Sequence, residues 1–177
     1  MRFFGLVTCL TISVCIAVEV HAAEPEVIRD RTLVVWAAVS DLGQKNTGMF
    51  VVQNGAAVFD GLIYAELKPK AWMAGSDFFR RTQHDQSKYP QETEAGKLVQ
   101  LAIVSKGKEV ELYRDGVLVS RYPIPGEPIS ISTKSEVLFG VHHLEMLGSM
   151  KFRGEVEDAR IYDRALSWQF SGAIDER

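Results

Sequence analysis

The side chains best suited to bind a ligand gather in one aromatic and basic segment, residues 71–96. Aromatic rings can stack on the apolar CH faces of a sugar, while arginine, histidine and carboxylate groups can hydrogen-bond to its hydroxyls. We therefore predict a ligand site in this segment, joined by a histidine from later in the chain. Its predicted members are Trp72, Asp77, Phe79, Arg80, Arg81, His84 and His142, with Phe78 beside them.

A different interpretation of the same segment stays open. Trp72 and one phenylalanine could fill a core between two sheets, because large aromatic side chains are usually buried. Arg80 and Arg81 could then pair with Glu92 and Glu94, which follow in an acidic loop.

Metal chemistry has weak support in the sequence. His142 and His143 are adjacent, so a strand would send their rings to opposite faces and one metal could not easily take both. We expect one packed and one exposed histidine. No cofactor is predicted, and the identity of any metal is left unknown.

Strand-like patterns dominate the chain and predict an all-β fold of two antiparallel sheets, a jelly-roll sandwich. Asp115-Gly116 lies between two apolar runs and predicts a tight hairpin turn. One short C-terminal helix is expected over 163–173, with Ser167 as a candidate N-cap. The expected strands span 33–39, 49–53, 58–67 (with a bend at Asp60-Gly61), 98–104, 109–113, 117–122, 136–144 and 152–162.

Residues 1–22 have the pattern of a signal peptide, with a positive start, an apolar run and small residues before position 23. We expect export, either secretion or delivery to the periplasm of a Gram-negative bacterium. Cys9 and Cys15 lie in this segment, so the expected mature domain, 23–177, has no cysteine, and no membrane span is expected after cleavage. The formal charge of −3 argues against a nucleic-acid partner.

Two motifs carry a resemblance to a known family. One is Tyr113-Arg114-Asp115-Gly116 between apolar runs, and the other is Phe152-Arg153-Gly154, followed by Glu157-Asp158-Ala159-Arg160-Ile161-Tyr162 and Leu166-Ser167. In these motifs the chain resembles the laminin-G-like branch of the concanavalin A-like lectin/glucanase superfamily. A narrower resemblance, to bacterial modules preceding levanase-like fructan hydrolases, rests on Thr32-Leu33-Val34-Val35-Trp36-Ala37, Phe59-Asp60-Gly61, Trp72-Met73-Ala74-Gly75-Ser76-Asp77-Phe78 and Arg80-Arg81-Thr82-Gln83.

The resemblance implies a lectin-like sandwich that binds ligands at its loops or on one sheet. It also raises calcium as a ligand, for which the candidate donors are Asp60, Asp77, Asp115 and Asp158. Their spacing closes no recognisable calcium loop. Asp115 is explained equally well by its turn.

Glu155 and Glu157 are the candidate catalytic pair. They lie two residues apart on an expected strand and so on one face, and retaining glycosidases hold two carboxylates roughly 5 Å apart. Glucanases of the superfamily need a third acidic residue, where this chain has Ala159 and Arg160. The alternative is a solvated outer face with an inward Asp158 bound to backbone.

The sequence therefore predicts a secreted, non-catalytic, lectin-like module that binds carbohydrate, with an accessory role to a polysaccharide-degrading enzyme as one form of this function. The expected partner is a polysaccharide or another protein domain. The second interpretation is a protein-interaction or spacer module without a small ligand, and the third is a small glycoside hydrolase.

Overall fold

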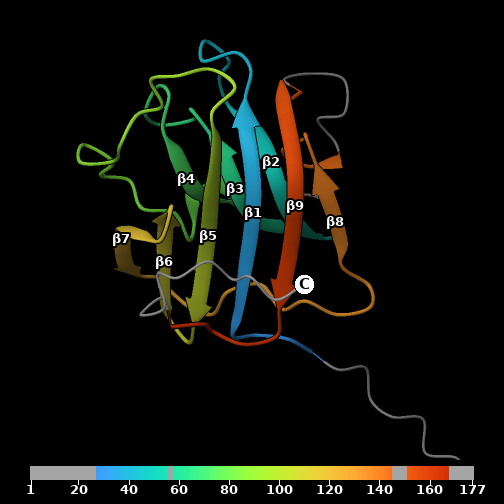
Figure 1. Ribbon diagram of the computed structural model, residues 1–177. Helices are drawn as coiled ribbons and strands as arrows, with labels where there is room; N and C mark the ends of the chain where they lie inside the picture. The colour runs from blue at the N-terminus through green and yellow to red at the C-terminus, as the bar shows by residue number, and fades with distance from the viewer. Residues whose placement is uncertain (1–26, 56–57, 145–150, 168–177) are drawn as a thin grey trace, which may run out of the picture.

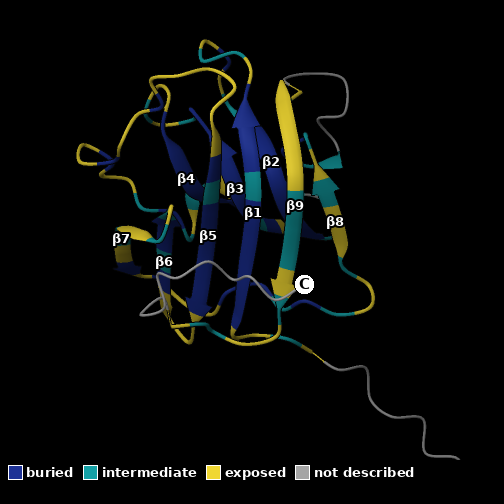
Figure 2. Cartoon of the chain, in the orientation of Figure 1, coloured by how far each residue is buried: buried dark blue, intermediate teal, exposed yellow. Residues whose placement is uncertain are grey.

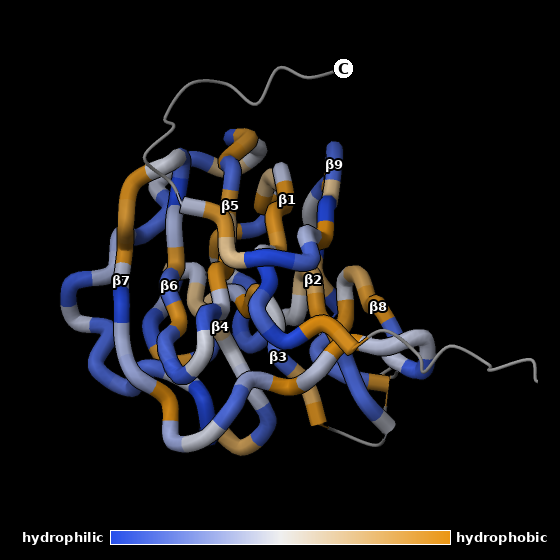
Figure 3. Tube along the Cα trace, turned by 90° about the horizontal axis from the view of Figure 1, so that it is seen from below, coloured by the Kyte–Doolittle hydropathy of each residue, from blue (hydrophilic) through white to orange (hydrophobic). Residues whose placement is uncertain are grey.

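Two antiparallel sheets packed face to face form the protein, as the sequence predicted. The computed structural model describes residues 27–55, 58–144 and 151–167. Figures 1 and 3 show the two layers of strands. The five-stranded sheet has the order β7-β6-β5-β1-β9, and the four-stranded sheet has the order β4-β3-β2-β8. The strands are β1 (Arg31–Val39), β2 (Thr47–Asn54), β3 (Val58–Tyr64), β4 (Trp72–Ser76), β5 (Leu98–Lys106), β6 (Glu109–Arg114), β7 (Val117–Pro123), β8 (Glu136–Phe139) and β9 (Gly154–Tyr162).

Strand β1 is buried on both faces, which explains its unbroken apolar run. Leu33 and Val35 face the other sheet as part of the main core, and Val34 belongs to a second cluster on the opposite face. The segment after β9 crosses near this outer face: the Thr32 hydroxyl donates to the Arg164 carbonyl and accepts from the Leu166 amide, both at 2.9 Å. Figure 2 shows β1 and its neighbour β5 as mostly buried.

The hairpin from β6 to β7 is set by local chemistry. Asp115 and Gly116 both have positive φ, at 48° and 76°, as a type I′ turn requires. The Asp115 carboxylate also accepts a hydrogen bond of 2.8 Å from the Gln100 amide on β5. This confirms the predicted turn and gives Asp115 a structural role.

Several predicted strand boundaries were wrong because the backbone turns left-handed earlier than expected. Ala65, with φ of 54°, follows the end of β3, and Gly140, with φ of 75°, follows the end of β8. The expected bend at Asp60-Gly61 is absent from β3. Gly61 instead allows a close approach, since a Cβ there would lie 2.6 Å from the Phe50 carbonyl oxygen.

Strand β4 was not predicted as a separate element. All five of its residues are buried, and they pair with β3 from Tyr64↔Trp72 to Asp60↔Ser76. Its Trp-Met-Ala-Gly-Ser sequence has no alternation of apolar and polar residues. Burial on both faces removes that alternation, so the period-2 signal is lost.

The expected C-terminal helix is not seen. Residues 163–167 are not helical, and residues 168–173, where a helix capped by Ser167 would begin, lie outside the described residues. The expected signal peptide, with both cysteines, also lies outside them. No helix in the described part of the chain is long and apolar enough to cross a bilayer.

Candidate functional site

A strained turn presents one aromatic ring to solvent. The 3-10 turn η1 (Asp77–Phe79) follows β4 directly, and Phe78 and Phe79 have φ of 48° and 57°. Left-handed backbone is unfavourable for bulky side chains and persists only where the surroundings impose it. The consequence is that Phe78 is 81% exposed, whereas Phe79 packs against the core.

A buried ion network imposes this turn. The Arg81 guanidinium binds the carboxylates of Asp60, at 2.8 Å, and Asp77, and the Arg81 amide donates to the Ser76 hydroxyl at 2.8 Å. Asp60 also binds Arg31 of the opposite sheet at 2.6 Å. Asp77 is only 3% exposed, so it and Arg81 anchor the turn to the sandwich.

The network fixes the charge of its arginines. Burial lowers the pKa of Arg31, and the Asp60 carboxylate opposes that shift. For Arg81, burial acts in the same direction, but Asp60 and Asp77 outweigh it and raise the pKa. Paired carboxylates therefore hold two cations inside the fold.

Beside the turn lies a groove of about 220 Å³, which we call the histidine groove. The segment after β8 forms one side of it: the Leu144 amide donates to the Gln53 side chain at 3.1 Å, and Gln53 pairs with Phe59 across β2 and β3. The groove thus lies where this segment meets the first residues of β3. Its lining residues are Asn46, Phe59, Glu66, Ser76, Asp77, Phe78, Phe79, His142 and His143.

The two histidines share one neighbour, so the predicted opposite placement of their rings was wrong. Strand β8 ends before them, and their ring centroids lie 4.8 Å and 5.9 Å from that of Phe59. The His142 Nε2 lies 3.4 Å from a Glu66 carboxylate oxygen. Across residues 27–55, 58–144 and 151–167, no group of three or more histidine, cysteine or acidic side chains could hold a metal ion.

Buried polar atoms in this groove lack hydrogen-bond partners. These are the Asn46 Oδ1 and the Nδ1 of His142, a residue that is 7% exposed. A buried polar atom without a partner costs roughly 1–3 kcal/mol.

The structure brings together part of the predicted site. Asp77, Phe79 and His142 line the groove. Arg80 lies next to it, with its guanidinium 5.5 Å from the centre of the Phe78 ring, and the His84 ring is 6.0 Å from that of Phe79.

The other predicted members serve the core. Trp72 is 3% exposed and packs on Tyr64 at 4.9 Å between ring centroids, as the alternative interpretation holds. The pairing expected for the two arginines was wrong: Arg80 and Arg81 bind Asp77, and Glu92 binds Arg114 instead.

Sequence reasoning missed five lining residues as members of the site: Asn46, Phe59, Glu66, Ser76 and His143. They come from separate parts of the chain, and no motif links all of them. The one local signal is the residue type of Asn46, since asparagine tolerates the left-handed backbone that it adopts here, with φ of 50°.

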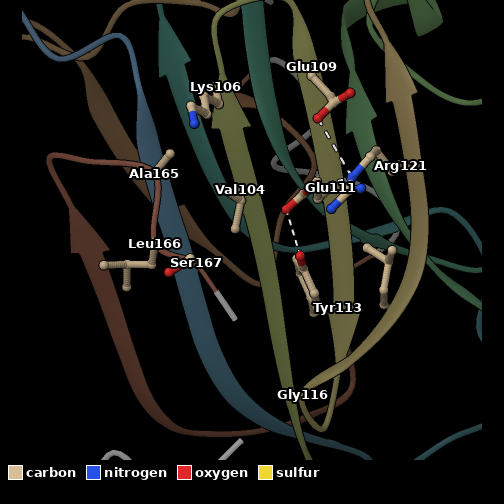
Figure 4. A pocket seen from close by; sticks show the side chains of 11 residues that line it. Val104, Lys106, Glu109, Glu111, Tyr113, Gly116, Arg121, Ala165, Leu166 and Ser167 are labelled. Atoms are coloured by element: carbon tan, nitrogen blue, oxygen red, sulfur yellow. Dashed lines mark hydrogen bonds and ion pairs between the residues drawn. The ribbon is translucent and has the colours of Figure 1, made fainter. Parts of the chain in front are cut away.

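A larger groove of about 630 Å³, which we call the sheet groove, lies on the other sheet over β5, β6 and β7 (Figure 4). Three of its polar groups pair with one another: Glu111 accepts from the Tyr113 hydroxyl at 2.6 Å and from the Arg121 guanidinium. Tyr113 itself is 7% exposed. The sheet groove therefore offers a ligand less exposed aromatic surface than the histidine groove, where Phe78 is 81% exposed.

The candidate catalytic pair lies in neither groove. Glu155 and Glu157 are exposed on β9, where a register shift opposite Trp36 and Ala37 leaves Glu157 without a pairing partner on β1. The expectation that Asp158 points inward was wrong, because its carboxylate is 43% exposed and binds Arg160 at 2.8 Å.

Comparison with known families agrees with this architecture. Residues 18–169 match the Laminin_G_3 family, described as concanavalin A-like lectin/glucanases superfamily. The chain therefore belongs to this family. A search of curated proteins finds no match to the chain.

Solved structures share the fold at low sequence identity. Domain 4 of AbnA, an extracellular arabinanase from Geobacillus stearothermophilus, in complex with arabinotriose, is 17% identical with a TM-score of 0.60, over 81% of this chain and 65% of that one. The CBM40 of Ruminococcus gnavus IT-sialidase, bound to sialyllactose, is 14% identical with a TM-score of 0.53, over 80% and 79%. Trypanosoma rangeli sialidase is 16% identical with a TM-score of 0.57, and the 79% of this chain that aligns spans only 21% of it.

Proposed function

We propose that this chain is an exported, non-catalytic carbohydrate-binding module whose ligand site is the histidine groove. The observation that carries the proposal is the strained turn that exposes Phe78 beside buried polar atoms without partners. Backbone strain of this kind clusters at ligand-binding and other functional sites, so the exposed ring supports a binding role.

The groove has the two kinds of group that sugar binding needs. Phe78 offers a flat apolar face for stacking, and Arg80 lies against that ring. Glu66, whose side chain is 14% exposed, offers carboxylate oxygens as acceptors for sugar hydroxyls. The volume of about 220 Å³ lies below the roughly 300–1,000 Å³ of typical small-molecule pockets, which suits a short sugar segment.

Two solved structures with a similar fold support the proposal that this chain binds carbohydrate. Both the AbnA domain and the CBM40 domain are complexes with oligosaccharides. We extend sugar binding to this chain as part of the proposal. Export rests on residues 1–22, and the accessory role and the levanase-associated relationship stay predictions.

The positions of Glu155 and Glu157 favour binding without catalysis. Glu155 and Glu157 lie on an exposed strand, on the sheet opposite to the one that carries the histidine groove. Neither lines a groove that could hold a glycosidic bond between them.

The test is a glycan array followed by titration calorimetry with Phe78→Ala and Phe139→Ala. Phe139 is a matched control, since it is also an exposed phenylalanine, at 49%, but does not line the groove. We expect F78A to weaken binding at least tenfold, about 1.4 kcal/mol, and F139A to change it little.

The proposal fails if no glycan is retained by the unmodified protein. It also fails if F78A and F139A weaken binding equally while both retain the same melting temperature. Sugar release that disappears in Glu155→Gln or Glu157→Gln would favour the glycosidase interpretation instead.

A further inference from the structure

We propose that the histidine groove selects uncharged sugars and rejects sugars that carry a carboxylate, with Glu66 as the specificity-determining residue. This inference rests on the proposed function and deepens it by naming the ligand class. It follows from the sign of the charges that line the groove.

The lining is acidic. Among the described residues that line the groove, two are carboxylates, Glu66 and Asp77, and none is a lysine or arginine. The Asp77 charge is matched by Arg81 and Arg80. The groove therefore has no lining cation left to receive an anionic ligand.

The Glu66 charge is the one that a ligand meets. Its side chain is 14% exposed, and the ion-pair partner that the structure gives it is His142, at 3.4 Å, whose imidazole is charged only when protonated. Glu66 therefore has no permanently charged cation as its partner, and its carboxylate lies in a partly buried position, where charge–charge interactions are screened less than in water.

The polar atoms of the groove also suit neutral ligands. The Glu66 carboxylate accepts hydrogen bonds and cannot donate when ionised. Sugar hydroxyls can donate to it. A sugar carboxylate cannot donate to it and would place a second negative charge beside Glu66.

Arg80 is the obvious route by which an acidic sugar could still bind. Its side chain is 65% exposed, but it does not line the groove, and it lies over the Phe78 ring and 3.5 Å from Asp77. A carboxylate drawn to Arg80 would compete with Asp77 at the rim. Arg80→Gln is therefore included in the test.

The experiment measures binding of the full chain at pH 8 to matched pairs of glycans that differ in charge. Suitable pairs are methyl-esterified and de-esterified polygalacturonan, and lactose and 3′-sialyllactose. For each pair that binds, we expect the neutral member to bind at least tenfold more tightly. In Glu66→Gln, which keeps the shape of the side chain, we expect that ratio to fall at least threefold.

Glu155→Gln is the matched control, because Glu155 is an exposed glutamate outside the groove. Its ratio should equal that of the unmodified protein. Tighter binding of the acidic member, lost in Arg80→Gln, overturns the selectivity but leaves sugar binding intact. An unchanged ratio in Glu66→Gln overturns the role of Glu66. Binding to no member of either pair, by a protein that retains another glycan on the array, overturns this inference and leaves the proposed function intact.

Discussion

Removing the charge of Asp60 should destabilise the fold far more than removing the charge of an exposed aspartate. Asp60 accepts hydrogen bonds from Arg31 at 2.6 Å, from Arg81 at 2.8 Å and from the Ile129 amide at 3.2 Å. Asp60→Asn keeps the shape of the side chain but leaves the Arg31 guanidinium, which is 1% exposed, without its carboxylate. Breaking a buried ion pair in this way costs about 3–5 kcal/mol.

That free energy corresponds to a drop of roughly 6–20 °C in Tm for a domain of this size. Urea unfolding followed by tryptophan fluorescence measures it directly. Asp158→Asn is the control, because Asp158 pairs with Arg160 at the surface, where the loss should stay below about 1 kcal/mol. If Asp60→Asn costs no more than Asp158→Asn, the network does not hold the turn, and the argument from Phe78 strain is lost.

Two further predictions concern buried aromatic side chains. Trp72→Ala should cost about 3–5 kcal/mol of stability, since the ring is 3% exposed, while leaving the glycan affinity of the folded protein within threefold in calorimetry; a selective loss of affinity would instead make Trp72 a ligand residue. Burial, together with a hydrogen bond to Glu111, raises the pKa of Tyr113 to about 12, so its contribution to stability is complete below pH 10 and is lost as the pH rises through 12. The urea concentration at the unfolding midpoint should therefore fall less steeply from pH 9 to 12 in Tyr113→Phe than in the unmodified protein. Equal slopes would contradict the raised pKa of Tyr113.

The parts of the fold that the sequence predicted are those in which neighbouring residues determine the geometry. Asp115 and Gly116 tolerate positive φ and lie between apolar runs, so the β6–β7 hairpin could be located before its partner strands were known. The alternation of Glu109, Val110, Glu111 and Leu112 fixes which face of β6 meets the core. One of the two family motifs lies in this hairpin, and the other covers β9 and its flanking residues.

The candidate site could be predicted only in part, because its geometry depends on contacts between distant residues. Arg81 looked like a ligand residue until its partner proved to be Asp60, 21 positions earlier in the chain. Gly140 ends β8 and so places His142 and His143 together on Phe59. Nothing near those histidines in sequence indicates this outcome.

The amino-acid sequence alone therefore determined the class of fold, its hairpin turns and the aromatic segment that could bind a ligand. Only the tertiary structure decided which of those aromatics is exposed and which acidic residues surround it. Turn and strand preferences come from local sterics and alternation, whereas burial and charge pairing follow from how two sheets and their loops pack against each other. Trp72 and Phe78, six residues apart, show the difference: one fills the core and the other meets solvent.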